Sequence, residues 1–484
     1  MKKSFFLISF ILLALCFLPA LTLPFAHHDN VRFFSKFYCP ASDNPQKRDP
    51  QYFLAYLIGR PLTAEIHQII FTHVSSIRDL TLVRWLTVTV FAICAGLLAN
   101  IFDSFGLSFL ESLGLSVAIF ILPGVQDGML MLGIQNALAV WATLWAYLVS
   151  CKSYKSRLED LFNGSVFFCL MLASMLLYPQ WSFFVFVPVL VKYMILSDPK
   201  GLSAIRKQIL HLLVFFSVTA VFYFFYIKIF VITDDSRAGT YAFTINFNFL
   251  FWKILSVFSK ILPMAFNFWN FQTITWLGLA IMGVTLVLLK RKTIICFLLI
   301  GWTLGFWLLI PSDLILHRIF YVTSVMALAV FLMGIRKFNK YLIMGAMTIG
   351  LIGVHYLTFF NAVNYNIEFS YIRQSLLNHR HFSRIHVVQV APNGKGYDGL
   401  ATVDDIFNAK TANYYFMTDT LNLVRGALRD IHYPDSVWIY SCESDQKKCV
   451  EHMPKGYRLL ITHTNKNQPI YYSPDMVLID MNDL

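Results

Sequence analysis

The chain has 484 residues, of which 57% are hydrophobic and 46 are phenylalanine, and its formal net charge is +12. Only 14% of the residues are charged and the mean hydropathy is +0.60, more than a water-soluble domain of this size needs for its core. The composition therefore excludes an ordinary soluble protein. The Lys and Arg residues form short clusters between apolar runs, where they act as topology signals, so the charge does not indicate nucleic-acid binding.

Apolar runs long enough to cross a bilayer, about 20 residues each, recur along the chain. The first extends from Ser4 to about Leu23 after a short basic start. We interpret it as a retained helix because its core is long for a signal peptide, although LPFA at its end also fits a cleavage site. Ten further runs, eleven in all, are predicted at about 81–101, 106–124, 128–150, 164–178, 181–197, 209–232, 272–289, 293–311, 317–335 and 341–360.

The loops between these runs differ in basic residues. With the N-terminus inside, fourteen basic residues fall at the inner side and one, Arg318, in the short outer turns, as the positive-inside rule requires. The inner residues are Lys2, Lys3, Lys152, Lys155, Arg157, Lys200, Arg206, Lys207, Lys290, Arg291, Lys292, Arg336, Lys337 and Lys340. An odd number of spans puts the C-terminus outside. The pattern predicts a multi-pass membrane protein with its N-terminus on the inner, cytoplasmic side and its C-terminal domain on the outer side.

Two long outer segments separate the spans. Residues 25–80 contain polar turns and then QYFLAYLIGRPLTAEIHQIIF, whose apolar positions recur at helical spacing broken by Gly59 and Pro61. Residues 233–271 are rich in Phe and Trp, with Trp252 and Trp269 placed like interface anchors. We expect both segments to contribute walls of a cavity that faces lipid.

The character of the chain changes near residue 361. The segments RIHVVQV, SVWIYS, YRLLITH and MVLID read as strands, and DDIFNA and LNLVRGALRDI as helices. We therefore predict a polytopic α-helical membrane module over 1–360, with an outer loop at 25–80, followed by a soluble α/β domain over 361–484. Cys442 and Cys449 flank a short polar stretch, which favours a disulfide in an oxidising compartment.

Asp29 stands just beyond the first span in the sequence HHDNVRF. A carboxylate at the membrane surface is partly desolvated, which can raise its pKa toward the range of a general base. Asp29 is therefore the lead catalytic candidate. The alternative is a solvated polar residue that simply follows a span.

A first span, then an acidic residue, then an outer loop containing Gly-Arg-Pro-Leu resembles the GT-C fold of multispan glycosyltransferases. The likeness is closest to the O-antigen glucosyltransferase type II family. It rests on Asp29, on YFLAYLIGRPL over 52–62 and, more loosely, on Arg318 before a late span, and it covers roughly residues 1–360. Such families often carry two adjacent acidic residues in the first outer loop, whereas Asn30 follows Asp29 here, so a divalent metal is left open as a cofactor.

The resemblance implies inverting transfer of a sugar from a polyprenyl-phosphate carrier to a cell-envelope glycan or glycolipid acceptor on the outer face, as in lipopolysaccharide modification. It also implies that the membrane is a bacterial inner (plasma) membrane, so that the outer C-terminal domain is periplasmic. Asp29 is the expected base, and Arg60 and Arg318 are the candidates for binding the phosphate, because a guanidinium matches phosphate oxygens bidentately. Each Arg also fits a snorkelling anchor. Asp127, in an outer turn, is a candidate for sugar hydroxyls or a plain turn residue. His28, beside His27, is a candidate for substrate binding or for assisting the base, and two adjacent histidines without a third ligand are weak signs of a metal site.

Three other classes of function fit parts of the pattern. A transporter or flippase suits many spans with long outer loops, but transporters usually carry ionisable groups within spans or repeated halves. The spans here are nearly free of mid-helix charge and no repeat is visible. A lipid-linked glycan polymerase or ligase shares substrates and topology, and a non-enzymatic envelope scaffold would use the outer domain.

Overall fold

The structure is a computed structural model. It describes residues 2–25, 59–74, 76–130, 133–152, 156–196, 198–231, 247–266, 272–288, 292–305, 307, 319–336, 339–377, 384–388, 427, 438–442, 470–473 and 476–480. Two compact units divide the chain. Unit 1 comprises 1–21, 52–68 and 83–358, and unit 2 comprises 22–51, 69–82 and 359–484.

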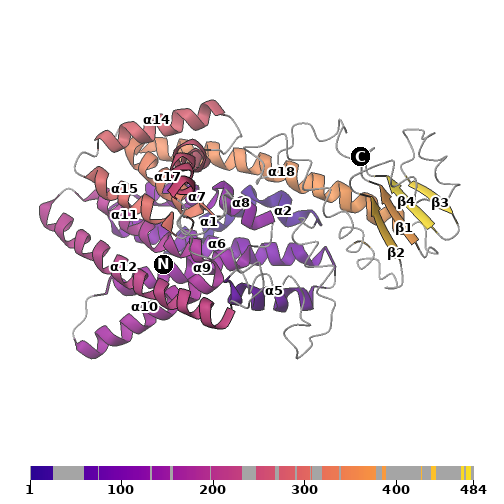
Figure 1. Cartoon of the computed structure of the whole chain (residues 1–484). Helices are drawn as coiled ribbons and strands as arrows, with labels where there is room; N and C mark the ends of the chain where they lie inside the picture. The colour runs from indigo at the N-terminus through magenta and orange to yellow at the C-terminus, as the bar shows by residue number, and fades with distance from the viewer. Residues whose placement is uncertain are drawn as a thin grey trace. The chain divides into compact units, whose positions relative to one another are not determined.

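The described part of the chain up to residue 377 is helical (Figure 1). The α-helices are α1 (Lys3–Cys16), α2 (Leu18–Thr22), α5 (Pro61–His73), α6 (Asp79–Ser104), α7 (Phe109–Phe120), α8 (Pro123–Leu130), α9 (Ile134–Ser150), α10 (Arg157–Leu177), α11 (Phe186–Ile195), α12 (Pro199–Tyr226), α13 (Phe247–Ser256), α14 (Gln272–Leu288), α15 (Thr293–Trp302), α17 (Tyr321–Arg336) and α18 (Tyr341–Leu377). Short 3₁₀ or π segments are η2 (Pro179–Val185), η3 (Ile227–Val231), η5 (Val257–Ile261) and η6 (Leu262–Phe266). Apolar runs form helices because a helix satisfies its own backbone hydrogen bonds where water is absent.

Four of the described helices are long and apolar enough to cross a membrane: Asp79–Ser104, Leu158–Leu177, Pro199–Ile229 and Tyr341–Phe359. A fifth candidate is the pair α7 and α8, which bends by 56°. The shorter apolar helices include Lys3–Cys16, Pro179–Ile195 and Tyr321–Arg336. The chain is thus a helical membrane protein, and the number eleven stays a prediction.

Several predicted boundaries differ from the structure. The run predicted at 128–150 is divided between α8 and α9, where the Gly133 amide donates to the Gly128 carbonyl at 2.5 Å. Helix α10 begins at Arg157 rather than near 164, because Ser156 caps it by accepting from the Glu159 amide at 3.3 Å. Helix α18 continues past the predicted end of the last span to Leu377.

Two ion pairs in unit 1 join helix ends that the basic-residue pattern assigns to the inner side. The Lys2 ammonium lies 2.6 Å from the Asp103 carboxylate, which joins the start of α1 to the end of α6. Arg336 Nε lies 2.7 Å from Glu111 Oε1, which joins the end of α17 to the start of α7. In both pairs, ends predicted to share a membrane side are in contact.

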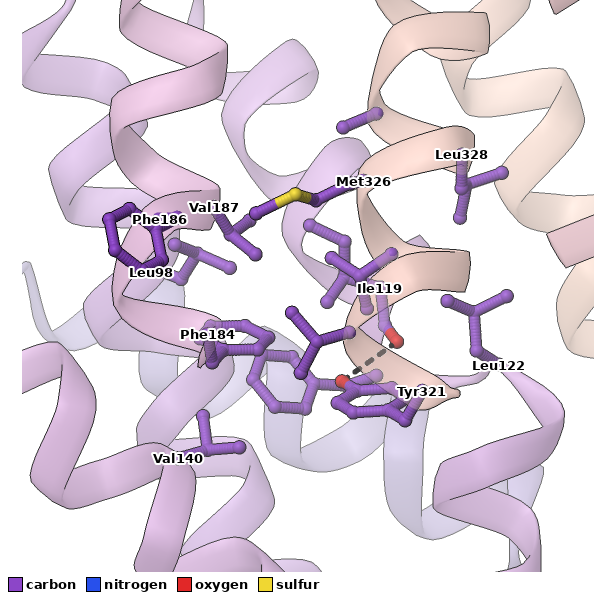
Figure 2. Packing of buried hydrophobic residues seen from close by; sticks show 14 of the residues in the cluster. Leu98, Ile119, Leu122, Val140, Phe184, Phe186, Val187, Tyr321, Met326 and Leu328 are labelled. Atoms are coloured by element: carbon purple, nitrogen blue, oxygen red, sulfur yellow. Dashed lines mark hydrogen bonds between the residues drawn. The ribbon is translucent and has the colours of Figure 1, made fainter. Parts of the chain in front are cut away.

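The core of unit 1 is a cluster of aromatic and branched apolar side chains from α6, α7, α9, η2, α11 and α17 (Figure 2). Tyr321, at the start of α17, is fully buried there and stacks on Trp181 with ring centres 4.1 Å apart. Its hydroxyl donates to the Ile119 carbonyl at 3.2 Å, as Figure 2 shows. The hydrogen bond satisfies a polar group that would otherwise be costly to bury.

Unit 2 contains a four-stranded sheet of β1 (Arg384–Val388), β2 (Trp438–Cys442), β3 (Ile470–Ser473) and β4 (Met476–Asp480), in the order β2-β1-β4-β3. Strand β1 runs parallel to β2 and β4, and β3 pairs antiparallel with β4. Three strands overlap predicted segments, and β3 was not predicted. Apart from Ala427, the two expected helices, together with YRLLITH and Cys449, lie outside the described residues, so the α/β class of this unit stays a prediction.

Candidate functional site

The predicted site residues are only partly described. Asp29, His27, His28 and Arg318 lie outside the described residues, and their roles stay predictions. Arg60 is described in full, and the backbone of Asp127 lies within helix α8 rather than in the predicted turn.

The Gly-Arg-Pro-Leu sequence forms the turn that starts α5. Gly59 has φ of +78°, a left-handed conformation that side chains other than glycine adopt with strain. Pro61 is the first residue of α5, where its missing amide hydrogen is not needed. The Gly59 carbonyl accepts a hydrogen bond from the Tyr223 hydroxyl at 2.9 Å, near the end of α12. Gly59 and Pro61 thus fix the backbone on both sides of Arg60.

The Arg60 side chain lies over an aromatic ring. Its guanidinium carbon is 3.7 Å from the centre of the Tyr178 ring, a cation–π contact at the end of α10. Arg60 Nε is buried and has no hydrogen-bond partner among the described residues. The side chain is therefore oriented by the ring while a donor stays unused, which leaves the guanidinium able to bind an anion.

Polar side chains of α5 meet the ends of neighbouring helices. Thr63 Oγ1 donates to the Leu177 carbonyl at 2.6 Å, and His67 Nε2 is 3.3 Å from Gln135 Oε1 at the start of α9. Thr63 and His67 are one helical turn apart and are buried, so α5 presents a polar face to these ends. The face joins α5, α9 and α10 at the ends that the topology prediction assigns to the outer side.

Helix α8 approaches the same helix start. A Cβ on Gly128 would lie 3.2 Å from Asn136 Nδ2, so Gly128 faces the Asn136 side chain. Asp127 immediately precedes Gly128 in α8. The backbone of Asp127 is thereby placed beside the start of α9, next to Gln135, which contacts His67.

Several buried polar atoms in these segments lack a hydrogen-bond partner within the described part of the chain. They are Gln126 Oε1, Asn136 Oδ1, Tyr178 Oη and Gln180 Oε1. The four residues are at most 7% exposed. Buried polar groups are nearly always paired, by protein, by water or by ligand. These four atoms are therefore available to hydrogen-bond water or a ligand.

Two buried cations were missed by sequence reasoning. Arg84, in the second turn of α6, is fully buried. Lys253, in α13, is 3% exposed, and its ammonium donates to the Trp307 carbonyl at 2.7 Å and lies 4.8 Å from the centre of the Trp307 ring. In the sequence, each of these cations could have been noticed as a single basic residue within an aromatic, apolar stretch.

Within the described ranges, no group of three His, Cys, Asp or Glu side chains is placed to hold a metal ion. Asp29, His27 and His28 are outside those ranges, so a divalent metal beside them stays an open alternative of the sequence analysis. Comparison with family models, with curated proteins and with solved structures found no match. The functional assignment therefore rests on the residues and contacts given above.

Proposed function

We propose that the protein is a membrane glycosyltransferase that moves a sugar from a polyprenyl-phosphate carrier to a glycan or glycolipid acceptor of the cell envelope. The observation that carries the proposal is the placement of Arg60. Its guanidinium lies over Tyr178, and its buried Nε has no hydrogen-bond partner among the described residues. Helix α5, which follows Arg60, presents the buried Thr63 and His67 to the ends of α10 and α9. A cation for phosphate beside polar groups for hydroxyls is what a lipid-phosphate sugar requires.

In this proposal, the acceptor hydroxyl attacks the anomeric carbon of the sugar while Asp29 removes its proton. The bond from the anomeric carbon to the phosphate oxygen breaks, with inversion at that carbon. Polyprenyl phosphate leaves with one more negative charge, which Arg60 and Arg318 stabilise. Asp127 and His28 bind sugar hydroxyls. Asp127 is supported by its place in α8 beside the start of α9.

The finer topology belongs to the same proposal. Eleven spans, with the N-terminus in the cytoplasm, put the α5 end of unit 1 and the C-terminal α/β domain on the periplasmic side of an inner membrane. The paired helix ends at Lys2–Asp103 and Glu111–Arg336 support the alternation of spans. A lipid carrier then reaches the site from within the bilayer.

The proposal is tested by mass analysis of lipid-linked sugars and envelope glycans from cells with and without the protein. We expect a polyprenyl-phosphate sugar to accumulate and one sugar to disappear from a glycan when the protein is absent. The purified protein, given that lipid-linked sugar, is expected to release polyprenyl phosphate and form the glycosylated acceptor. Unchanged lipid-linked sugars and glycans in its absence would overturn the assignment.

A polysaccharide flippase is the second candidate, because Arg84 is fully buried in a helix long enough to span a membrane. A lipid-linked glycan polymerase or ligase would also use the Arg60 site. Proteoliposomes separate these functions. A flippase moves a labelled lipid-linked sugar across the bilayer without changing it, a polymerase lengthens it, and a glycosyltransferase splits the sugar from its lipid.

A further inference from the structure

A cavity of about 530 Å³ opens between four helices of unit 1, where α9 and α11 end and α10 and α12 begin. Its polar lining includes Cys151 of α9's C-cap, Asn163 of α10, Lys192 of α11 and Lys207, Gln208 and His211 of α12. Helices α10 and α12, which bound it on one side, lie close together in Figure 1. Four helices thus direct polar groups into one space.

The charge of the lining is positive. Lys192 and Lys207 come from different helices, and Asp160 is the one carboxylate in the lining. The Lys192 ammonium is partly buried and 5.5 Å from the centre of the Phe105 ring, which restricts its position. Gln208 Nε2 donates to Cys151 Sγ at 3.1 Å and carries a second hydrogen for another acceptor. The polar end of the cavity is therefore suited to an anion with several acceptor oxygens.

The remainder of the lining is apolar. Phe167 of α10 and Leu212 and Phe215 of α12 form one wall. Phe215 is about half exposed, as are Val214 and Leu210 on the same helix. In a helix that is long and apolar enough to cross a membrane, such exposed side chains face lipid. The cavity thus has a cationic end and a wall that continues onto the lipid-facing surface.

This cavity is separate from the Arg60 site. Cys151 follows the last residue of α9 and Gln135 lies at its start, so about 16 residues at 1.5 Å each put roughly 24 Å between them. The same holds on α10, where Asp160 and Tyr178 are at opposite ends. A separation near the thickness of the hydrocarbon core puts the two sites at opposite membrane faces.

We propose that this cavity binds a phospholipid with an anionic headgroup from the leaflet at the basic ends of α9–α12. Lys192 and Lys207 bind the phosphate, Asn163 and Gln208 hydrogen-bond the headgroup, and an acyl chain lies along Phe167 and Phe215. Basic pockets between membrane helices recognise anionic lipids by these means. The ligand holds the four helix ends together and does not take part in sugar transfer.

The test uses the full-length protein in nanodiscs of phosphatidylcholine with or without phosphatidylglycerol, and delipidated protein titrated with each lipid in native mass spectrometry. We expect phosphatidylglycerol to bind at least tenfold tighter than phosphatidylcholine. The double variant Lys192→Gln/Lys207→Gln should lose most of that preference. The control Lys152→Gln/Lys200→Gln changes two basic residues that do not line the cavity, and it should keep the preference.

Three results would overturn the proposal. The first is an equal loss of the preference for phosphatidylglycerol in the control variant, which would mean diffuse attraction to a basic surface. The second is no preference for phosphatidylglycerol in the parent protein. The third is equally tight binding of inorganic phosphate alone, which would mean a site for free anions. Photo-crosslinking of the unmodified protein with a phosphatidylglycerol analogue avoids reliance on a variant that fails to fold. Crosslinked peptides should map to 160–167 and 204–215, and crosslinks confined to other helices would count against the cavity.

Discussion

The guanidinium of Arg60 lies 3.7 Å from the centre of the Tyr178 ring. Tyr178 contacts Trp181 with ring centres 6.1 Å apart, and Trp181 stacks on the buried Tyr321. A row of aromatic rings therefore leads from Arg60 to the core of unit 1. Arg60, the residue before α5, is thereby held by the same packing that fixes α17.

Replacing the Tyr178 ring should weaken use of the lipid-linked sugar. A cation–π contact contributes about 0.5–2 kcal/mol, so Tyr178→Leu is expected to lower kcat/KM for the donor by roughly 2- to 30-fold. Tyr178→Phe keeps the ring and removes the hydroxyl, and it should stay within about threefold of the parent if the ring alone orients Arg60. Steady-state transfer assays with varied donor distinguish the two. Equal losses in both variants would assign the effect to the hydroxyl instead.

Gly334 permits close packing of α17 on α14. A Cβ at Gly334 would meet the side chain of Thr285, whereas a Cβ at Gly345 in α18 would meet nothing within 4 Å. Gly334→Ala is expected to destabilise the protein by about 1–3 kcal/mol through overpacking. Gly345→Ala should be neutral or up to about 1 kcal/mol stabilising, because Ala favours helix. Thermal unfolding in detergent measures both, and a stable Gly334→Ala protein would contradict the packing.

The two ion pairs between helix ends, Lys2–Asp103 and Arg336–Glu111, should differ in strength. The Glu111 side chain is 7% exposed, and besides Arg336 it accepts hydrogen bonds from the Ser108 amide and hydroxyl at 2.8 and 2.7 Å. Glu111→Gln is therefore expected to destabilise by about 1.5–3 kcal/mol. Asp103→Asn removes a pair with a mostly exposed Lys2 and should change the free energy of unfolding by less than about 1 kcal/mol. The same unfolding assay compares them, and the reverse order would contradict the geometry.

The positions of the helices could largely be predicted from the sequence, because an apolar segment inside a membrane must satisfy its own backbone hydrogen bonds and therefore forms a helix. Their ends could not. Hydrophobicity ends near Phe360, but α18 continues to Leu377 through a polar segment, since backbone hydrogen bonding does not depend on apolar side chains. Similarly, α10 gains its first turns from the polar sequence RLEDLFN.

The candidate site could be predicted only in part. Arg60 stood out through its motif, and Gly59 and Pro61 indicated a break in the helical spacing. Tyr178 could not be recognised, because an aromatic residue at the end of an apolar run is typical of interface anchoring, and its contact with Arg60 joins residues more than a hundred positions apart. The contacts of Thr63, His67 and Gln135 could not be predicted either, because they form only when α5 packs on α9 and α10.

Membrane sidedness is predicted by the basic residues and can be measured. Single cysteines at positions 155 and 400, in a protein otherwise free of cysteine, are expected to react from opposite sides of the membrane with an impermeant maleimide. In spheroplasts with an intact inner membrane, position 400 should be labelled at once. Position 155 should be labelled only after the membrane has been permeabilised. A cysteine at 204, in the basic start of α12, serves as the control and should behave like 155. Labelling of 155 and 400 from one side would contradict an eleven-span topology.

Asp29→Asn should leave a folded, inserted protein with almost no transfer activity. Loss of a general base commonly lowers rates by roughly 10²–10⁴, whereas removal of a solvated surface carboxylate changes stability by less than about 0.5 kcal/mol and leaves turnover unaltered. Asp43→Asn is a matched control, because Asp43 is another carboxylate of the same predicted outer segment. It should retain full turnover with the lipid-linked donor. Because asparagine keeps the size of the side chain but cannot accept the proton, unchanged unfolding with lost turnover would assign the proton transfer to Asp29. Turnover of Asp29→Asn within about threefold of the parent would exclude that role and direct attention to Asp127, which α8 places beside the start of α9.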